Sequence, residues 1–325
     1  MQKTADTGSL SKITRVGIVE IGSRAVRLLV ADVSREKGLT AITTRVAKAQ
    51  LMDAILNGEA ASQRQLAEVM DAVKTFREIA VRHGVQRLAV FGTEAIRRLA
   101  LFENSTINSM LSTVDVISAA TEADCSLHAA LMGLGGKEFR NIPLLVIDQG
   151  AGSTELVTGI RNSHIQVRSF ASLPLGGNGA LELYRSQHFD ISKFLASTAP
   201  RVDELRLTTS GVRQAIVQGS VATKCAWFRL NLLAGTFDKR YEASAVHGEF
   251  FTLENMEKLV VFAEQPAASR WKAWINREDP NEFNRIRTGV AILGQLLTKF
   301  DISNIYVSAF GTRHGMAWRL AMTDG

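Results

Sequence analysis

Two short segments of the sequence place an acidic residue at the end of an apolar run, followed at once by glycine and hydroxyl side chains. The first reads VEIGS and contains Glu20, and the second reads IDQGAGSTEL and contains Asp148. Glycine lets the backbone approach a ligand closely, so that several N–H groups can point at one anion, and hydroxyl groups add further donors. The residues expected to bind phosphate in this way are Gly22 and Ser23 in the first turn, and Gly150, Ala151, Gly152, Ser153 and Thr154 in the second.

The acid before the second turn is a candidate metal ligand. Mg²⁺ favours one or two carboxylates together with water and phosphate oxygens, and Asp148 ends the strand that leads into the turn. An ordinary β-hairpin would need the glycines for its turn alone. The recurrence of the same arrangement at Gly22 and Ser23 favours a phosphate site with Mg²⁺ over the plain hairpin.

The segments around these turns alternate between strand and helix patterns. Val16 to Val33 has β-branched residues on both sides of its glycine turn, which predicts two strands joined by that turn. Apolar residues recur at helical spacing from Ser62 to His83, and Gly84 stands where a C-cap belongs. The same reasoning predicts strands at 39–45, 87–91, 114–117, 144–148, 153–160, 164–170, 214–218 and 304–307, and helices from 93, at 120–134, 179–185 and 191–207, from 222, and at 282–300 and 312–322.

The arrangement of strand, glycine turn and strand occurs once in each half of the chain. This internal duplication predicts an α/β protein with two like domains that face each other across a cleft, so that equivalent turns converge on one ligand. The Gly135-Gly136 pair divides the halves, which gives an N-terminal domain at 1–136 and a C-terminal domain at 137–325. The closing helix after 311 is expected to pack on the first domain.

Composition restricts the class of protein and of partner. Of 325 residues, 46% are hydrophobic and 22% charged, and no apolar run approaches the ~18 residues that span a bilayer. Two distant cysteines, six scattered histidines and an N-terminus without a secretory pattern predict a reduced, cytoplasmic protein with no zinc site. The net charge of +6 favours an anionic partner, whereas the dispersed basic residues and few aromatics argue against nucleic acid.

Seven segments in order resemble the exopolyphosphatase / guanosine pentaphosphate phosphohydrolase family. They are VGIVEIGSRAVRLLVADV, VFGTEAIRR, VISAATEA, LLVIDQGAGSTELV, SLPLGG, QGSVATKCA and VSAFGTRHG, and the resemblance runs from about Val16 to Leu320. It implies an actin-like fold of two ribonuclease-H-type domains. It also implies hydrolysis of the terminal phosphoanhydride bond of inorganic polyphosphate, or of the 5′-phosphate of guanosine pentaphosphate, with a divalent metal such as Mg²⁺. A homodimer would be consistent with the family, although no stripe of residues indicates an interface.

The resemblance assigns further roles one residue at a time. Glu122, in ISAATEA, occupies the position of the family's catalytic base, where a carboxylate at a helix start can deprotonate a water. From the residues alone, Glu122 is better explained as an acid that favours the helix dipole. Arg97 matches an arginine that grips the phosphoryl group through its planar fork. Arg313 matches the loop that closes the site, and Gly219 and Ser220 match a loop that lines the substrate channel.

The first turn departs from the family's Asp-x-Gly-Ser-Asn-Ser. Glu20 is one methylene longer than Asp, which moves the carboxylate by roughly 1.5 Å, Arg24 replaces Asn, and Ala25 lacks the hydroxyl. In one interpretation Arg24 binds phosphate and supplies positive charge, Glu20 joins Asp148 at the metal, and the chain is a hydrolase. In the other, the chain senses polyphosphate or a guanosine alarmone with impaired catalysis. The retained Asp148 and Glu122 favour hydrolysis.

Two other classes of enzyme share parts of this pattern. An actin-like kinase or chaperone ATPase has similar glycine turns, but it needs an adenosine pocket that the second half of the sequence does not show. A dinucleotide-binding dehydrogenase needs a glycine turn that leads from a strand into a helix. Here the turn at Gly150 to Gly152 leads into another predicted strand, which argues against that class.

Overall fold

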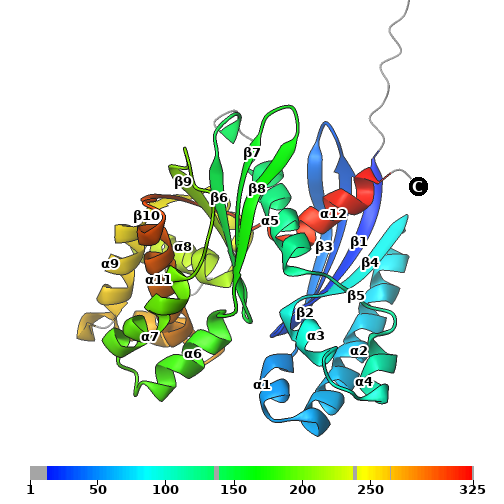
Figure 1. Ribbon diagram of the computed structural model, residues 1–325, viewed down its shortest axis with the longest axis horizontal. Helices are drawn as coiled ribbons and strands as arrows, with labels where there is room; N and C mark the ends of the chain where they lie inside the picture. Colours follow the sequence, from blue (N-terminus) through cyan, green and yellow to red (C-terminus); the bar gives the residue numbers. More distant parts are fainter. Residues whose placement is uncertain (1–12, 135–138, 237–239, 264, 324–325) are drawn as a thin grey trace, which may run out of the picture.

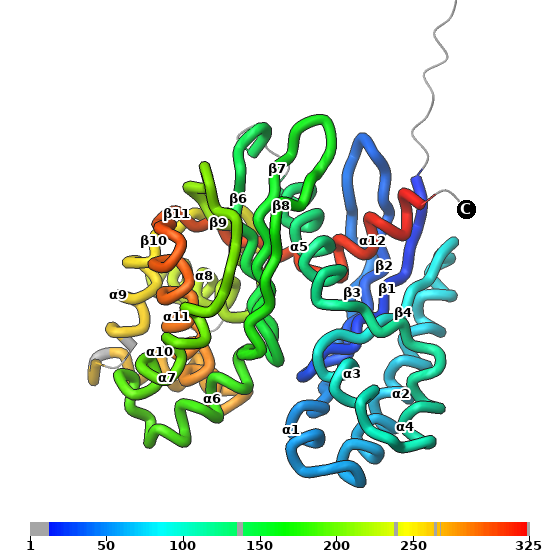
Figure 2. Tube along the Cα trace, in the orientation of Figure 1, coloured from blue at the N-terminus to red at the C-terminus, as the bar shows by residue number. Residues whose placement is uncertain are grey.

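The computed structural model describes residues 13–134, 139–236, 240–263 and 265–323. These residues form two lobes that lie side by side, each built on a mixed β-sheet, with two helices between the sheets (Figures 1 and 2). The predicted α/β class is therefore confirmed. None of the helices in these ranges is both long and apolar enough to cross a membrane.

The first lobe is built on a five-stranded sheet with strand order β3-β2-β1-β4-β5. Strands β1, β2 and β3 are antiparallel, whereas β4 runs parallel to β1, and β5 to β4. The elements are β1 (Thr14–Ile21), β2 (Ala25–Ser34), β3 (Gly38–Lys48), α1 (Leu51–Leu56), α2 (Glu59–Arg82), β4 (Arg87–Gly92), α3 (Glu94–Leu99), α4 (Ser105–Leu111) and β5 (Asp115–Val116).

The second lobe repeats this topology. Its sheet has the order β10-β11-β9-β6-β7-β8, so that β8-β7-β6-β9-β11 matches β3-β2-β1-β4-β5 in order and direction, with β10 added at the edge. The elements are β6 (Leu144–Gln149), β7 (Thr154–Arg161), β8 (Ile165–Leu173), α6 (Gly177–Ser186), α7 (Ile191–Asp203), β9 (Gln214–Gln218), α8 (Ser220–Leu233), η2 (Ala243–Val246), β10 (Phe250–Thr252), α9 (Leu253–Ala263), η3 (Pro266–Ala268), α10 (Ser269–Ile275), α11 (Glu282–Lys299) and β11 (Asn304–Val307).

Two further helices, α5 (Ala119–Gly133) and α12 (Thr312–Met322), connect the lobes. Helix α5 packs on the second sheet, where Leu127 joins a buried cluster with Val146 and its neighbours. Helix α12 packs on the first sheet, where Ala317 lies in a cluster with Ile18. Helices α5 and α12 are called the hinge helices. Helix α5, from the first half of the chain, thus covers the second sheet, and α12, from the second half, covers the first sheet. The predicted boundary between domains, at 136, lies outside the described residues.

The sheets are covered on both faces, which explains their sequences. In β1, Val16 and Ile18 face the cluster under α12, whereas Val19 and Ile21 face the cluster under α2. Strands that are buried on both faces read as continuous apolar runs rather than as alternating ones. The same holds for β6, in which Leu144 to Ile147 are fully buried.

The strand-turn-strand units were predicted at their observed positions, but several elements were not predicted. The short helices α1 and α4 and the whole segment from η2 to α10 have no counterpart in the prediction. The helix expected at 191–207 ends earlier, at Asp203, as α7. The strand expected at 114–117 is reduced to the two residues of β5.

Candidate active site

The two glycine turns have the same internal hydrogen bond. The Gly22 N–H donates to the carbonyl of Ala25 at 3.0 Å, and the Gly150 N–H donates to the carbonyl of Ser153 at 2.9 Å. After each glycine, successive N–H groups make no hydrogen bond within the described residues: those of 23 and 24 in the first turn, and of 151, 152 and 153 in the second. Successive unpaired backbone N–H groups in a turn form a concave site for an anion.

These turns, from opposite lobes, lie against each other. A Cβ added to Gly152 would stand 2.6 Å from the hydroxyl oxygen of Ser23 and 3.3 Å from Cγ of Glu94. Because glycine has no Cβ, the Ser23 hydroxyl can approach the backbone of Gly152 this closely. The structure therefore brings Gly22, Ser23 and the Gly150–Ser153 turn together at one place between the lobes.

The second turn is held by a neighbouring loop. The N–H groups of Gly176, Gly177 and Asn178 donate to the carbonyls of residues 152, 150 and 151, at 2.9–3.1 Å. The hydroxyl of Thr154 donates to the Leu175 carbonyl at 2.9 Å and is buried. These bonds fix the carbonyl side of the turn, so its N–H side faces away from them. The Thr154 hydroxyl, predicted to bind phosphate, is used inside the fold.

The loop predicted to line the substrate channel also packs on this turn. Gly219 has φ +96°, and a Cβ there would overlap the carbonyl oxygen of Gln149. Both observations require glycine at this position. Ser220 is the first residue of α8, directly after this contact. Gly219 thus supports the second glycine turn from behind.

Two carboxylates end the central strands of the two sheets. Asp148, near the end of β6, accepts hydrogen bonds from Ser126 Oγ at 2.6 Å and from Thr312 Oγ1 at 3.2 Å. Burial raises the pKa of Asp148, the bond from Ser126 lowers it, and the charge of Glu20 raises it again, with a net rise. Glu20 Oε2 is buried without a hydrogen-bond partner in the described residues and lies 3.6 Å from Arg313 Nη1.

The carboxylates of Asp148 and Glu20 suit Mg²⁺, which takes few protein ligands, better than a metal ion that needs three or more protein ligands. No group of three or more His, Cys, Asp or Glu among the described residues is arranged to hold a metal ion. Mg²⁺ commonly takes one or two carboxylates and completes its shell with water and phosphate oxygens. Asp148 and Glu20, one from each lobe and close enough for their charges to interact, provide such a donor pair. Glu20 Oε2, which accepts no hydrogen bond in the described residues and lies 3.6 Å from Arg313 Nη1, offers the second carboxylate oxygen.

Glu122 lies in the first turn of α5, after the N-cap Ser118, whose hydroxyl accepts the Thr121 N–H at 3.1 Å. Its side chain is buried and accepts a hydrogen bond from Arg97 Nη1 at 2.9 Å on Oε2. Burial and the negative charge of Glu155 raise the pKa of Glu122 well above its usual value, and Arg97 opposes that rise. A raised pKa makes this carboxylate a stronger base than an exposed glutamate.

Arg97 is held from three sides. Besides Glu122, it donates to the Ile117 carbonyl at 2.9 Å and pairs with Glu94 at 3.1 Å. Its guanidinium is therefore fixed beside the carboxylate that it orients. The structure thus places Arg97 as the partner of Glu122.

Glu155 is a candidate site residue that the sequence reasoning missed. It lies on β7, is 2% exposed, and accepts a hydrogen bond from Ser172 Oγ at 3.1 Å. Burial raises its pKa to about 7, with the charge of Asp148 adding to the rise and the hydroxyl of Ser153 opposing it. An acid within a strand whose other residues are mostly apolar or hydroxyl-bearing was the available signal, because burying a carboxylate is costly without a compensating use.

Arg24, predicted to bind phosphate, makes contacts across the cleft in this structure. Its guanidinium lies 3.0 Å from Asp279 and 3.9 Å from Glu282, both in the second lobe. It also lines a pocket of about 420 Å³, whose walls include Lys224, Trp227, Tyr241 and Trp274. The first turn and the second lobe are thus joined by ion pairs at this point.

The chain is similar in sequence to curated exopolyphosphatases of mycobacteria. An exopolyphosphatase 2 of Mycobacterium tuberculosis is 28% identical over 174 residues, 49% of this chain and 52% of that protein. An exopolyphosphatase 1 of Mycobacterium leprae is 28% identical over 170 residues, 50% of this chain and 47% of that protein. The chain thus matches about half the length of these curated relatives.

Solved structures show the same fold over nearly the whole chain. The crystal structure of the Aquifex aeolicus member of the Ppx/GppA protein family has a TM-score of 0.75 at 23% identity, covering 95% of this chain and 97% of that one. An exopolyphosphatase from Cytophaga hutchinsonii has a TM-score of 0.66 at 16% identity, covering 95% and 98%. A family model described as the Ppx/GppA phosphatase family matches residues 29–323. The chain therefore belongs to the Ppx/GppA phosphatase family.

Proposed function

We propose that this protein is a Mg²⁺-dependent hydrolase that releases the terminal phosphate of inorganic polyphosphate or of guanosine pentaphosphate. The observation that carries the proposal is the contact between the two N–H-rich turns, one from each lobe, beside the carboxylates of Glu20 and Asp148. Two such turns can hold neighbouring phosphoryl groups of one chain. The curated relatives are named exopolyphosphatases, which supports this class of substrate.

The reaction that we propose is attack of water on the terminal phosphorus. The new bond joins the water oxygen to phosphorus, the anhydride P–O bond breaks, and the shortened phosphate chain leaves with the bonding electron pair. Glu122 takes the proton of the water on Oε1, while Arg97 holds Oε2 at 2.9 Å. Mg²⁺, held by Asp148 and Glu20, would neutralise charge on the phosphate oxygens.

The raised pKa of Glu122 fits this role. A general base works best when its pKa lies near the working pH, because it is then both partly ionised and basic enough to accept the proton. Burial and the charge of Glu155 provide that rise. Phosphate release should therefore increase with pH through the pKa of Glu122.

The test is phosphate release from a short polyphosphate and from guanosine pentaphosphate, with and without Mg²⁺. The wild type should release phosphate from at least one compound only when Mg²⁺ is present. Glu122→Gln should lower the rate about a hundredfold or more. Glu103→Gln, an exposed glutamate of the same lobe, is the matched control and should keep the full rate.

Two outcomes would contradict the proposal. One is full activity of Glu122→Gln, which would remove the assigned base. The other is a folded wild type that releases phosphate from neither compound at any Mg²⁺ concentration. Circular dichroism of each variant establishes that it is folded before its rate is interpreted.

A further inference from the structure

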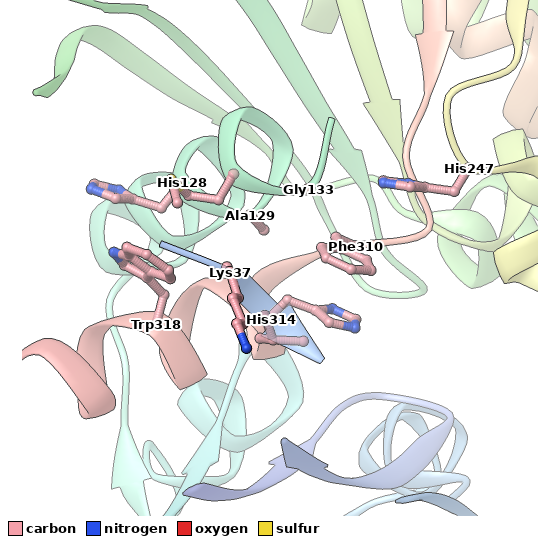
Figure 3. A pocket seen from close by; sticks show the side chains of 11 residues that line it. Lys37, His128, Ala129, Gly133, His247, Phe310, His314 and Trp318 are labelled. Atoms are coloured by element: carbon pink, nitrogen blue, oxygen red, sulfur yellow. The ribbon is translucent and has the colours of Figure 1, made fainter. Parts of the chain in front are cut away.

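A second pocket lies at the hinge, apart from the phosphate turns. It has a volume of about 180 Å³ and is lined by α5, by α12 and by the turn between β2 and β3 (Figure 3). Because α5 packs on the second sheet and β3 belongs to the first, both lobes contribute to its walls. None of the residues assigned above to phosphate or metal lines it.

Three stacked rings form one side of this hinge pocket. Phe310 lies between His247, with ring centroids 4.7 Å apart, and His314, with centroids 4.3 Å apart. Figure 3 shows Phe310 between these two rings, with Lys37 nearby. Both faces of Phe310 are thus covered by the imidazole rings, so only the edge of the Phe310 ring can contact a ligand in the pocket. Aromatic edges carry partial positive charge and favour a negative neighbour.

Both histidines of the stack accept a backbone hydrogen bond at Nδ1, which leaves Nε2 as the hydrogen-bond donor of each ring. His247 Nδ1 accepts the Ala309 N–H, and His314 Nδ1 accepts the Gly311 N–H, each at 3.1 Å. A neutral imidazole that accepts at Nδ1 carries its hydrogen on Nε2. The Nε2 of His247 is buried with no hydrogen-bond partner in the described residues. The stack therefore has an N–H group that lacks an acceptor.

The charge of the lining is positive. Lys37 contributes an ammonium group, and the described residues that line the pocket include no Asp or Glu. The nearest acid on α5, Asp124, is engaged by Arg319 at 3.2 Å and by His128 at 3.5 Å. A lining with one cation, imidazole donors and ring edges favours an anion.

The remaining walls are apolar and limit the size of the occupant. Leu39, Met132 and Trp318 line the pocket together with Phe310. A cavity of about 150 Å³ can hold benzene, so this hinge pocket has room for one ring and a small charged group. Metal binding is disfavoured, because no described cluster of three or more ligating side chains is present.

We propose that the hinge pocket is a second ligand site, and that it binds a small aromatic carboxylate. The carboxylate would lie beside Lys37 and accept from one imidazole Nε2–H, because Phe310 separates the rings of His247 and His314. The ring would lie against Leu39, Met132 and Trp318. The proposal is independent of the proposed hydrolysis, since its residues are different.

Benzoate is the probe, and its affinity for the full chain is measured by calorimetry and by the imidazole ¹⁵N resonances of labelled histidines. Binding should be saturable and should shift the signals of His247 and His314. Benzyl alcohol, which has the ring without the charge, should bind at least about fivefold more weakly. Sulfate, which has charge without the ring, should displace benzoate only at higher concentration.

Three substitutions test whether benzoate binds in the hinge pocket. Lys37→Met keeps the apolar stem and should weaken benzoate about five- to tenfold, whereas Arg35→Met, an exposed cation of the same turn, should change it less than about twofold. Met132→Glu, which puts a carboxylate on the wall, should abolish binding in a folded protein. Equal affinity for benzyl alcohol, unchanged affinity in Lys37→Met, or no saturable binding of benzoate would overturn the proposal. Phosphate release enters none of these measurements.

Discussion

Replacing Glu155 by Gln should stabilise the protein, and only above mildly acidic pH. Burial raises the pKa of Glu155 to about 7, because the fold favours the neutral carboxyl group over the carboxylate. Gln is neutral at every pH, is nearly the same size, and can accept the hydrogen bond that Ser172 donates at 3.1 Å. The variant therefore removes the ionisation and keeps the packing.

The magnitude follows from the two pKa values of this side chain. The gap between 4.5 in an exposed chain and about 7 in the fold corresponds to about 3 kcal/mol of unfolding free energy. Because the folded-state pKa is raised, this stability is fully present below pH 4.5 and is lost as the pH rises through 7. Glu155→Gln should match the wild type near pH 4.5 and exceed it by about 3 kcal/mol above pH 7.

The assay is urea unfolding of both proteins from pH 4.5 to pH 8.5, in EDTA so that metal binding does not contribute. Glu204→Gln, an exposed glutamate of the same lobe, is the matched control and should follow the wild type at every pH. A thermal scan at pH 8 should show the gain as a rise in Tm of about 4 °C.

The same variant has a second readout in activity. The negative charge of Glu155 raises the pKa of Glu122, so its removal should move the pH dependence of phosphate release toward lower pH. A stability difference that does not change with pH, or a variant less stable than the wild type at pH 8, would refute the assignment of Glu155 as a buried acid that ionises near neutral pH. A variant that gains stability but keeps the wild-type pH–rate profile would refute its coupling to Glu122.

Three further substitutions test other parts of the structure. Gly315→Ala should lower the unfolding free energy by about 2–3 kcal/mol, because a Cβ there would overlap the carbonyl of Cys125, and a normal urea midpoint would contradict that contact. Ser126→Ala removes the 2.6 Å hydrogen bond to Asp148 and should slow phosphate release about tenfold, while the unfolding free energy stays within about 1 kcal/mol of wild type. An unchanged rate would show that this bond does not matter for catalysis. Arg24→Met should cost less than about 1 kcal/mol, and 1 M NaCl should abolish the difference, since its ion pairs across the cleft are partly exposed. A loss that persists in salt would indicate packing rather than charge.

The repeated strand-turn-strand units could be predicted because their signals are local. In β1–β2 and β6–β7, a short apolar run, a glycine turn and a second run follow one another within about twenty residues, and each hairpin satisfies its own hydrogen bonds. The duplication then predicts that the two sheets share one topology, as they do. Helix α1 was missed because six residues are too few to show a helical period.

The site could be predicted only where its residues adjoin the turns. Gly22, Ser23 and Gly150 follow an acid at the end of a strand, and that order is visible in the sequence. The ion pair of Arg24 with Asp279 joins residues 255 positions apart, so no local pattern indicates it. Glu155 reads as one polar residue in a strand, and its charge interaction with Glu122 depends on how α5 packs on the second sheet.

The hinge helices explain how two acids from different lobes come to face each other. Ser126 on α5 and Thr312 on α12 are 3.0 Å apart, and both donate to Asp148 of the second lobe. The next residue, Arg313, reaches Glu20 of the first lobe. One turn of α12 therefore contacts both carboxylates of the candidate metal site.

The position of that turn is set by the crossing of the two helices at Gly315, where the backbones touch because no side chain separates them. Residues 312 and 313 lie within one helical turn of this crossing, so a change in the crossing must move their side chains. The same turn carries His314, which lines the hinge pocket on the other side. A change in this crossing would therefore alter contacts at Glu20 and Asp148 as well as at the hinge pocket.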